Sequence, residues 1–340
     1  MRRYIKYFLL VISFFLGCQK KSSVITSGVS IELAQSRKAS ISDVRYKIHF
    51  DIPKQKDDHI IAYEYIYFAL SNLSSNIILD FRQTADHIFS ISVGGKTVPF
   101  KLIDQHIIIE PSYFSLGQNT IFISFRAGDM SLNRNDEFLY TLFVPDRAST
   151  AIPCFDQPNL KAKYSLTLSI PVDWTAIANG PIVSEKIIDD KREMVFAETL
   201  PISTYIFAFT AGKFERVSQL KNGRKMTMLH RETDREKVER NKDEIFELHA
   251  RALSWMEDYT GIDYPFQKFD FALIPGFQYG GMEHPGAIFY KDASLFLDLS
   301  ATKNQFLSRA GLISHETAHM WFGDPVTMDW FDDVWTKEVF

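Results

Sequence analysis

Hydrophobic and polar residues alternate along several segments between Tyr46 and Phe214, a pattern typical of strands with one buried face. Two segments show it most clearly, with apolar positions at Tyr46, Ile48, Phe50 and Ile52 and at Tyr164, Leu166, Leu168 and Ile170. The run Val93-Gly94-Gly95-Lys96 indicates a hairpin turn, because glycine readily adopts a positive φ. We therefore predict half-buried antiparallel sheets, and we expect three aromatic residues to pack in their core: Tyr63, Tyr65 and Tyr67.

After Phe214 the apolar positions change to a helical period. Residues 233–259 form one predicted helix, followed by Gly261, with an apolar face of Ile245, Leu248, Ala252 and Met256. Residues 303–321 form a second helix, with Gly323 as a stop and expected buried positions at Phe306, Ala310 and Ile313. A third helix is expected from about Val334, capped by Asp332 or Asp333. These patterns predict a β domain over residues 41–214 and an α+β domain over residues 215–340.

Two histidines and a later glutamate in this second region have the spacing H-E-x-x-H, eighteen residues, E. His315 and His319 are four residues apart, so a helix directs both imidazoles to one point, and Glu338 adds a carboxylate. This ligand set leaves the fourth tetrahedral position of one Zn²⁺ ion open, as hydrolysis requires. Zinc lowers the pKa of its bound water and polarises a carbonyl. Glu316, on another side of the helix, is expected to be the base that accepts the water's proton.

A second motif, Gly280-Gly281-Met282-Glu283-His284, precedes the first, and its glycines allow another backbone to approach closely. With both motifs present, the chain resembles the M1 family of zinc aminopeptidases, which carries G-x-M-E-N upstream of H-E-x-x-H-x18-E. The run P-C-F-D-Q-P at residues 153–158 is similar to the P-C-F-D-E-P of that family. The resemblance extends from roughly Tyr46 to the last residue.

This resemblance implies an N-terminal antiparallel all-β domain followed by the front part of a thermolysin-like α+β zinc peptidase domain. It also implies that Glu283 holds the free α-amine of a peptide substrate, and that Gly280, Gly281 and Met282 bind substrate beside it. A carboxylate next to the metal selects an ammonium group and fixes which peptide bond reaches the zinc. The implied activity is removal of N-terminal residues from peptides with a free N-terminus.

Several positions depart from the family pattern. His284 replaces the family's Asn, and two roles for it remain open, namely tuning of amine binding and simple packing. The residues around the third ligand, Thr336-Lys337-Glu338-Val339, replace the common L-N-E-G. Many members carry substrate-contacting Gln and Glu at the positions of Leu142 and Val144, so specificity that depends on those contacts does not transfer.

The family pattern also extends beyond the third ligand, to a tyrosine that stabilises the oxyanion and to a helical C-terminal domain. Neither lies within these 340 residues, so we expect a chain truncated at the C-terminus whose own activity is impaired or absent. A non-catalytic peptide-binding or zinc-binding fragment of an M1-type enzyme is an alternative. A third possibility is a relative that uses the same zinc to open an epoxide, as one branch of the family does.

The first residues have the features of an export signal. Basic residues precede an apolar run from Tyr7 to Leu16 that is too short to span a bilayer, which indicates a signal peptide over residues 1–17. The sequence Phe15-Leu16-Gly17-Cys18 is similar to a bacterial lipobox, with ordinary signal-peptidase cleavage as an alternative. We predict lipidation of Cys18, a tether over residues 18–40, and a lipid-anchored location in a bacterial cell envelope, at the outer membrane or facing the periplasm.

Composition supports this picture without adding chemistry. With only Cys18 and Cys154 present, acylation of Cys18 leaves Cys154 as a single thiol that we expect to be buried. The formal net charge is −4 and no basic cluster occurs, which argues against a nucleic-acid partner. We therefore expect two kinds of partner: peptide substrates, and a membrane contacted through the lipid.

Overall fold

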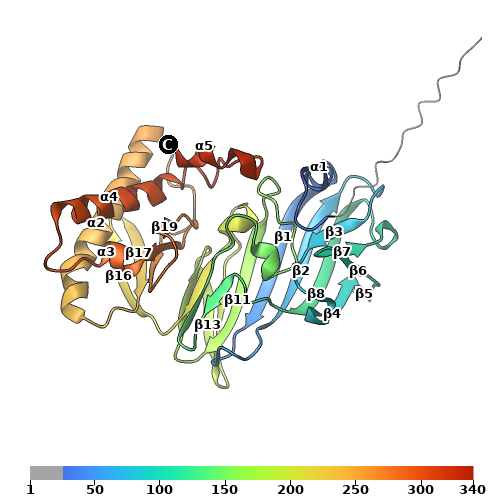
Figure 1. The fold of residues 1–340 in the computed structure, drawn as a ribbon, viewed down its shortest axis with the longest axis horizontal. Coiled ribbons are helices and arrows are strands. Elements are labelled where there is room, and N and C mark those ends of the chain that lie inside the picture. The colour runs from blue at the N-terminus through green and yellow to red at the C-terminus, as the bar shows by residue number, and fades with distance from the viewer. Residues whose placement is uncertain (1–25, 340) are drawn as a thin grey trace, which may run out of the picture.

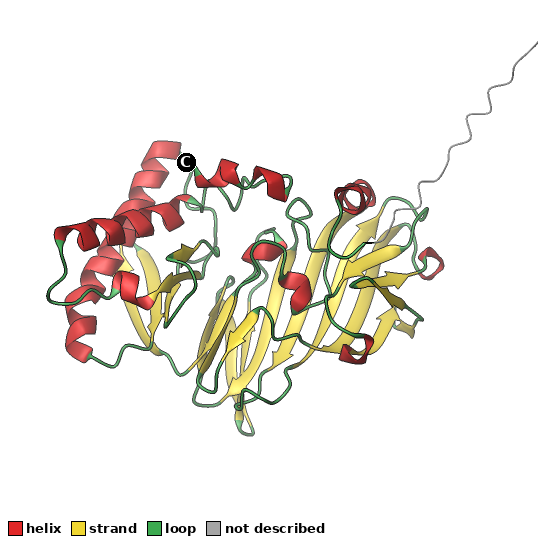
Figure 2. Ribbon diagram, in the orientation of Figure 1, coloured by secondary structure: helices red, strands yellow, loops and turns green. Residues whose placement is uncertain are grey.

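The structure is a computed structural model that describes residues 26–339. It contains a large β region and a smaller region in which helices cover a sheet (Figure 1; Figure 2). The predicted signal peptide and Cys18 lie outside the described residues. Within residues 26–339, no helix is both long enough and apolar enough to cross a membrane.

The β region is built around one large sheet with two smaller sheets beside it (Figure 1). In spatial order, the large sheet consists of β13 (Ile182–Ile188), β14 (Lys191–Phe196), β11 (Lys163–Pro171), β1 (Ile41–Asp51), β2 (Ile61–Leu70), β8 (Gly117–Arg126), β4 (Ile88–Val93) and β5 (Lys96–Thr97). The second sheet contains β12 (Thr175–Ala178), β15 (Phe209–Gly212), β10 (Phe138–Thr141) and β9 (Leu132–Arg134). The third contains β3 (Ile77–Asp80), β7 (His106–Ile109) and β6 (Lys101–Ile103).

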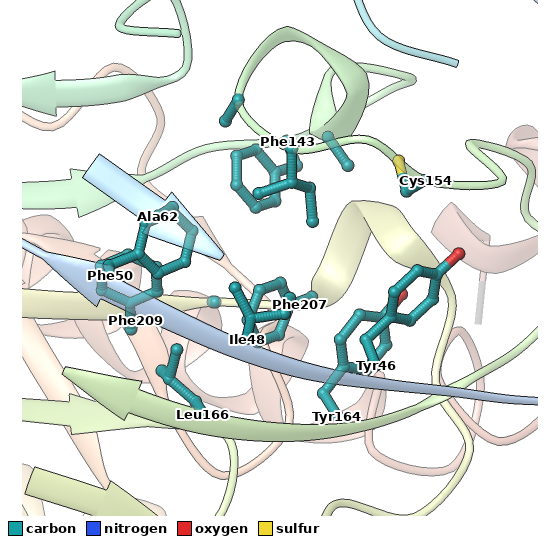
Figure 3. Close-up of a cluster of buried hydrophobic side chains, with 14 of the residues drawn as sticks. Tyr46, Ile48, Phe50, Ala62, Phe143, Cys154, Tyr164, Leu166, Phe207 and Phe209 are labelled. Carbon is teal, nitrogen blue, oxygen red and sulfur yellow. The ribbon is translucent and has the colours of Figure 1, made fainter. Parts of the chain in front are cut away.

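The predicted alternation in β1 and β11 is confirmed, because all the apolar positions in these two strands are buried. Tyr46 stacks on Tyr164 with 5.0 Å between ring centroids, and Tyr164 stacks on Phe207 at 4.4 Å. Figure 3 shows these rings in one cluster with the buried thiol of Cys154. Pairing in the large sheet is antiparallel as expected, except that β1 and β11 run parallel, with Tyr46 opposite Tyr164. Parallel pairing is possible here because the chain forms β2 to β10 before it returns as β11.

The three tyrosines of β2 are not in the core. Tyr63 is 40% exposed, and Tyr65 and Tyr67 are half-buried, because they share the outer face of the strand. The opposite face is buried and includes Glu64, neither of whose carboxylate oxygens has a hydrogen-bond partner among the described residues. Burial raises the pKa of Glu64 well above its usual value, which favours the neutral acid.

The structure differs from the expected tether, because part of it is helix α1 (Ile31–Ser40). The hydroxyl of Ser30 caps this helix by accepting a hydrogen bond from the N–H of Leu33. The buried guanidinium of Arg37 donates to both oxygens of Asp80, at 2.7 and 2.8 Å, and His106 Nδ1 lies 2.8 Å from Asp80 Oδ1. An unpaired buried carboxylate is costly, and the helix supplies its partner.

Asp80 gives a pH-dependent prediction. Burial alone raises its pKa, but Arg37 and then His106 outweigh burial and lower the pKa from 3.8 to about 2. The resulting stability is present above pH 3.8 and is lost as the pH falls through about 2. The difference in unfolding free energy between the wild type and Asp80→Asn should therefore shrink by about 2 kcal/mol between pH 5 and pH 2, measured by urea unfolding. Parallel pH profiles for the two proteins would contradict this.

The second region has a mixed five-stranded sheet covered by helices (Figure 2). In spatial order, its strands are β16 (Glu215–Lys221), β17 (Arg224–His230), β18 (Phe271–Ile274), β20 (Ile288–Lys291) and β19 (Gly281–Met282). Its helices are α2 (Arg235–Thr260), α3 (Asp292–Leu295), α4 (Lys303–Ala318) and α5 (Trp335–Glu338). Short 3-10 helices occur at Ala85–His87, Pro111–Tyr113, Ala148–Thr150, Thr204–Ile206 and Phe331–Asp333.

Helix α2 confirms the predicted long helix, with small shifts. It begins after Asp234, whose side chain accepts from the N–H of Lys237, and it ends at Gly261 with φ 65°. Its buried face is displaced from the predicted one. Ile245 and Met256 are buried, whereas Leu248 and Ala252 are half-buried and line a groove between α2 and α4.

Candidate metal centre

Helix α4 carries most of the candidate site. A capping box starts it: the Thr302 hydroxyl accepts from the N–H of Gln305, and the Gln305 side chain accepts from the N–H of Thr302. The helix ends at Ala318, and His319 is its C-cap, so the predicted end at 321 is three residues too late. Phe306 is 47% exposed rather than buried. Arg309 takes the buried position instead, where its guanidinium donates to the carbonyl of Leu295 at 3.1 Å.

The three predicted metal ligands converge at the C-terminal end of α4. His315 Nε2 and His319 Nε2 are 3.2 Å apart. Glu338 Oε2, from α5, lies 3.5 Å from His315 Nε2 and 3.8 Å from His319 Nε2. Helix α5 begins at Trp335, close to the predicted start, but it has no side-chain cap, so the expected cap by Asp332 or Asp333 is wrong. The residues before α5 begin with a 3-10 turn instead.

These distances suit a zinc ion. With ligands at about 2.0–2.1 Å, neighbouring donor atoms of a tetrahedral site lie about 3.3–3.4 Å apart. His319 Nδ1 lies 3.0 Å from the carbonyl oxygen of Phe322, an acceptor that places the ring proton on Nδ1 and leaves the Nε2 lone pair for the metal. Gly323, predicted only as a stop, leaves room for this ring, since a Cβ there would lie 2.8 Å from His319 Nδ1.

A second group of potential ligands shares His319. One ligand atom each from Glu283, Glu316 and His319 lies within 4.8 Å of the others, and all three residues are buried. Glu283, however, already has a cationic partner, because the ammonium of Lys337 forms an ion pair with its Oε1. Lys337 Nζ also lies 3.4 Å from Glu338 Oε1, so its charge does not separate the two sets. The donor atoms of His315, His319 and Glu338 lie 3.2–3.8 Å apart, close to the spacing of a tetrahedral zinc site, and this set therefore fits the metal better.

A carboxylate oxygen of Glu316 lies within 4.8 Å of a ring nitrogen of His319, one of the predicted metal ligands. Burial, and then the carboxylates of Glu283 and Glu338, raise the pKa of Glu316 well above its usual value. Without a metal this favours the neutral acid, whereas a cation bound by the neighbouring ligands would favour the ionised carboxylate that a proton acceptor requires. A Cβ on Gly281 would lie 2.3 Å from Glu316 Oε1 and 2.5 Å from its Cδ. The missing side chain of Gly281 is therefore what gives the Glu316 carboxylate its space.

This contact predicts the effect of Gly281→Ala. The new methyl group must displace the Glu316 carboxylate, and a misplaced catalytic group costs about tenfold or more in rate. We expect kcat of the full-length protein to fall by about that factor while its zinc content, measured by atomic absorption, stays unchanged.

Gly311→Ala is the matched control, because Gly311 lies on the same helix as Glu316 and a Cβ there would meet no atom within 4 Å. We expect unchanged turnover and about 0.5–1 kcal/mol of added stability from alanine in a helix. A Gly281→Ala protein as active as this control would refute the positional role of Gly281.

In the upstream motif Gly280 is exposed and Gly281 is partly buried, whereas Met282, Glu283 and His284 are buried. Gly281 and Met282 form β19, and Met282 packs in the main core. His284 is fully buried with its ring edge-on to Phe289 at 4.7 Å, and neither ring nitrogen has a hydrogen-bond partner among residues 26–339. Burial lowers the pKa of His284 to about 3. Of its two possible roles, the structure favours packing as a neutral ring.

Comparison with known proteins agrees with this geometry. A model of the peptidase family M1 domain matches residues 244–340, and a model of the peptidase M1 N-terminal domain matches residues 43–206. The chain belongs to the M1 peptidase family.

Several curated M1 relatives are similar over much of the chain. Probable aminopeptidase 2 of Sulfurisphaera tokodaii is 32% identical over 82% of this chain and 35% of its own length. Leucyl aminopeptidase of Saccharolobus solfataricus is 29% identical over 87% of this chain and 37% of its own length. Human endoplasmic reticulum aminopeptidase 1 is 37% identical over 59% of this chain and 21% of its own length. The chain thus spans about a third or less of the length of these relatives.

Sequence reasoning missed two residues of this M1 site. Lys337 is 5% exposed and interacts with Glu283, although the sequence shows it only as the residue before the third ligand. Tyr205, from the β region, packs its ring 4.9 Å from the Lys337 ammonium, and its hydroxyl donates to the carbonyl of Gly323 at 3.2 Å. Its position depends on the packing of the two regions, for which the local sequence carries no signal.

A groove of about 1050 Å³ runs between α2 and α4 and reaches one candidate metal ligand, His315. Trp255 and Tyr259 of α2 line it, and their rings stack at 4.9 Å while remaining 60% and 69% exposed. His315 lines its other side. Solvent and ligands can therefore reach His315 from this groove.

Proposed function

We propose that this chain provides the catalytic centre of a zinc-dependent aminopeptidase that removes N-terminal residues from peptides with a free N-terminus. The observation that carries the proposal is the convergence of two imidazoles and a carboxylate beside two further buried carboxylates. His315, His319 and Glu338 would hold the ion, and Glu316 and Glu283 remain for proton transfer and substrate binding. Zinc, when bound, supplies Lewis-acid activation of water and of the scissile carbonyl.

Glu316 has the position and environment of a general base. Buried beside the metal ligands, it can accept a proton from the attacking water and later deliver it to the leaving amine. Its low exposure keeps bulk water from competing for that proton. A carboxylate oxygen of Glu283 lies within 4.8 Å of ligand atoms of Glu316 and His319. Glu283 is therefore close enough to hold a substrate amine one residue from the reacting bond.

The direct test is hydrolysis by the zinc-loaded full-length protein. We expect chelator-sensitive release of the N-terminal residue from aminoacyl-nitroanilides, with slower cleavage of the matched N-acetylated substrates. No chelator-sensitive hydrolysis of either kind would contradict the proposal.

A non-catalytic zinc-binding role has one observation in its favour for residues 26–340 alone. The side chains of His315 and Glu338 are 41% and 44% exposed, and Glu338 ends a four-residue helix. Such ends fray, and an exposed site gives weaker electrostatic stabilisation. We expect residues 26–340 alone to turn over at least tenfold more slowly per bound zinc than the same residues in a chain extended to the length of the M1 relatives. Equal turnover numbers would contradict this.

The proposal includes location in a bacterial envelope. It rests only on the N-terminal sequence, and lipidation of Cys18 stays a prediction that metabolic labelling with a radioactive fatty acid, compared with Cys18→Ser, would test. Absence of label from the wild type would reject it.

A further inference from the structure

Lys337 carries its ammonium into the centre of the site. The side chains of Lys337 and Glu283 are 4% and 5% exposed, and the two groups form an ion pair. Lys337 Nζ also lies 3.4 Å from Glu338 Oε1 and 4.9 Å from the centroid of the Tyr205 ring. Two carboxylates and an aromatic face surround one cation, so the ammonium is held from several sides.

This arrangement matters because a lysine ammonium and a peptide α-ammonium are the same kind of group. Both are compact cations with three N–H donors, and both seek a carboxylate. Glu283 is the carboxylate assigned to the substrate amine, and in this structure it already has an ammonium partner from the chain itself. A second ammonium beside the first would be repelled, because Lys337 and Glu283 are both buried and little water screens their charges.

We propose that Lys337 is a specificity-determining residue that occupies the amine-binding carboxylate, so that a substrate α-amine binds Glu283 only by displacing it. The inference rests on the proposed function and refines its substrate preference. The site still prefers a free N-terminus, but by a smaller factor than a site in which Glu283 has no cationic partner of its own.

Metal-binding inhibitors separate this inference from the proposed function. L-leucine hydroxamate and N-acetyl-L-leucine hydroxamate bind a metal through the same hydroxamate and differ only in their amine. Calorimetry with the zinc-loaded full-length protein therefore gives two affinities, and their ratio measures the preference for a free amine independently of turnover.

Lys337→Asn is expected to raise the ratio of free-amine to acetylated affinity at least tenfold. L-leucine hydroxamate should bind more tightly to this variant, because Glu283 then has no cationic partner from the chain. Lys337→Arg, the matched control that keeps the charge, should leave the ratio within about threefold of the wild type. The double variant Glu283→Gln, Lys337→Met has neither charge. Its affinity for L-leucine hydroxamate, relative to the acetylated ligand, should not exceed that of the wild type. An unchanged or reduced ratio in Lys337→Asn would overturn the inference.

Two further outcomes keep the test decisive. If neither hydroxamate binds the wild type, the proposed metal centre fails and the inference fails with it. If Lys337→Asn does not fold, a crystal structure of the wild type with L-leucine hydroxamate decides. Displacement of Lys337 Nζ from Glu283 by the ligand amine is the expected result. An intact ion pair with the ligand amine bound elsewhere would overturn the inference.

Discussion

Glu316→Gln is expected to lower kcat of the full-length protein by about 10²–10⁴, the usual contribution of a general base. Glutamine has nearly the shape of glutamate, so the packing against Gly281 is kept, but its amide cannot accept the proton of the attacking water. Zinc binding should persist, because Glu316 is not among the three proposed ligands. The measurement is kcat on an aminoacyl-nitroanilide together with zinc content.

The melting temperature of this variant serves as its control. Glu316 is buried and its raised pKa favours the neutral acid, so the neutral glutamine should not destabilise the zinc-free fold. A Glu316→Gln protein that keeps more than a third of wild-type turnover would remove Glu316 from the mechanism.

His319→Ala is expected to weaken zinc binding by about 10³-fold. Complete zinc sites are worth about 10–16 kcal/mol over four ligands, so one ligand accounts for a few kcal/mol. His319 is also 3% exposed, and the Phe322 carbonyl fixes the orientation of its ring, so its Nε2 is a preorganised ligand. Competition with a chromogenic zinc chelator measures the affinity.

His249→Ala is the matched control for this loss. His249 is fully buried on α2, where it contacts the carbonyl of Ile245 at 2.8 Å and the hydroxyl of Tyr290 at 3.1 Å. Its removal should destabilise the fold without changing zinc affinity. Equal loss of zinc from both variants would mean that destabilisation, and not ligand removal, explains the effect.

Local pattern was sufficient where one physical rule acts over a short span. The alternation around Tyr46 marked a strand because only one face of β1 is buried, and the spacing of His315 and His319 marked a shared metal position because one helical turn separates them. The same rule left β2 ambiguous, since aromatic residues on its outer face resemble a buried face. Glu64, on the opposite face, was therefore not recognised as buried.

Positions that depend on distant partners could not be predicted in this way. Arg37 is buried because Asp80, on another element, needs a counter-charge, and a basic residue in a polar segment gives no local sign of this. Lys337 is buried for the same reason, since Glu283 and Tyr205 reach it from other parts of the fold. In both cases a long-range ion pair determines the placement of a charged residue that hydrophobic periodicity would assign to the surface.

Anomalous diffraction at the zinc absorption edge, from crystals of the zinc-loaded protein, tests the central claim most directly. The account predicts one peak about 2.0–2.2 Å from His315 Nε2, His319 Nε2 and a Glu338 carboxylate oxygen, with Glu316 outside the coordination sphere. A peak coordinated by Glu283, Glu316 and His319, or no peak within reach of His315, would contradict it.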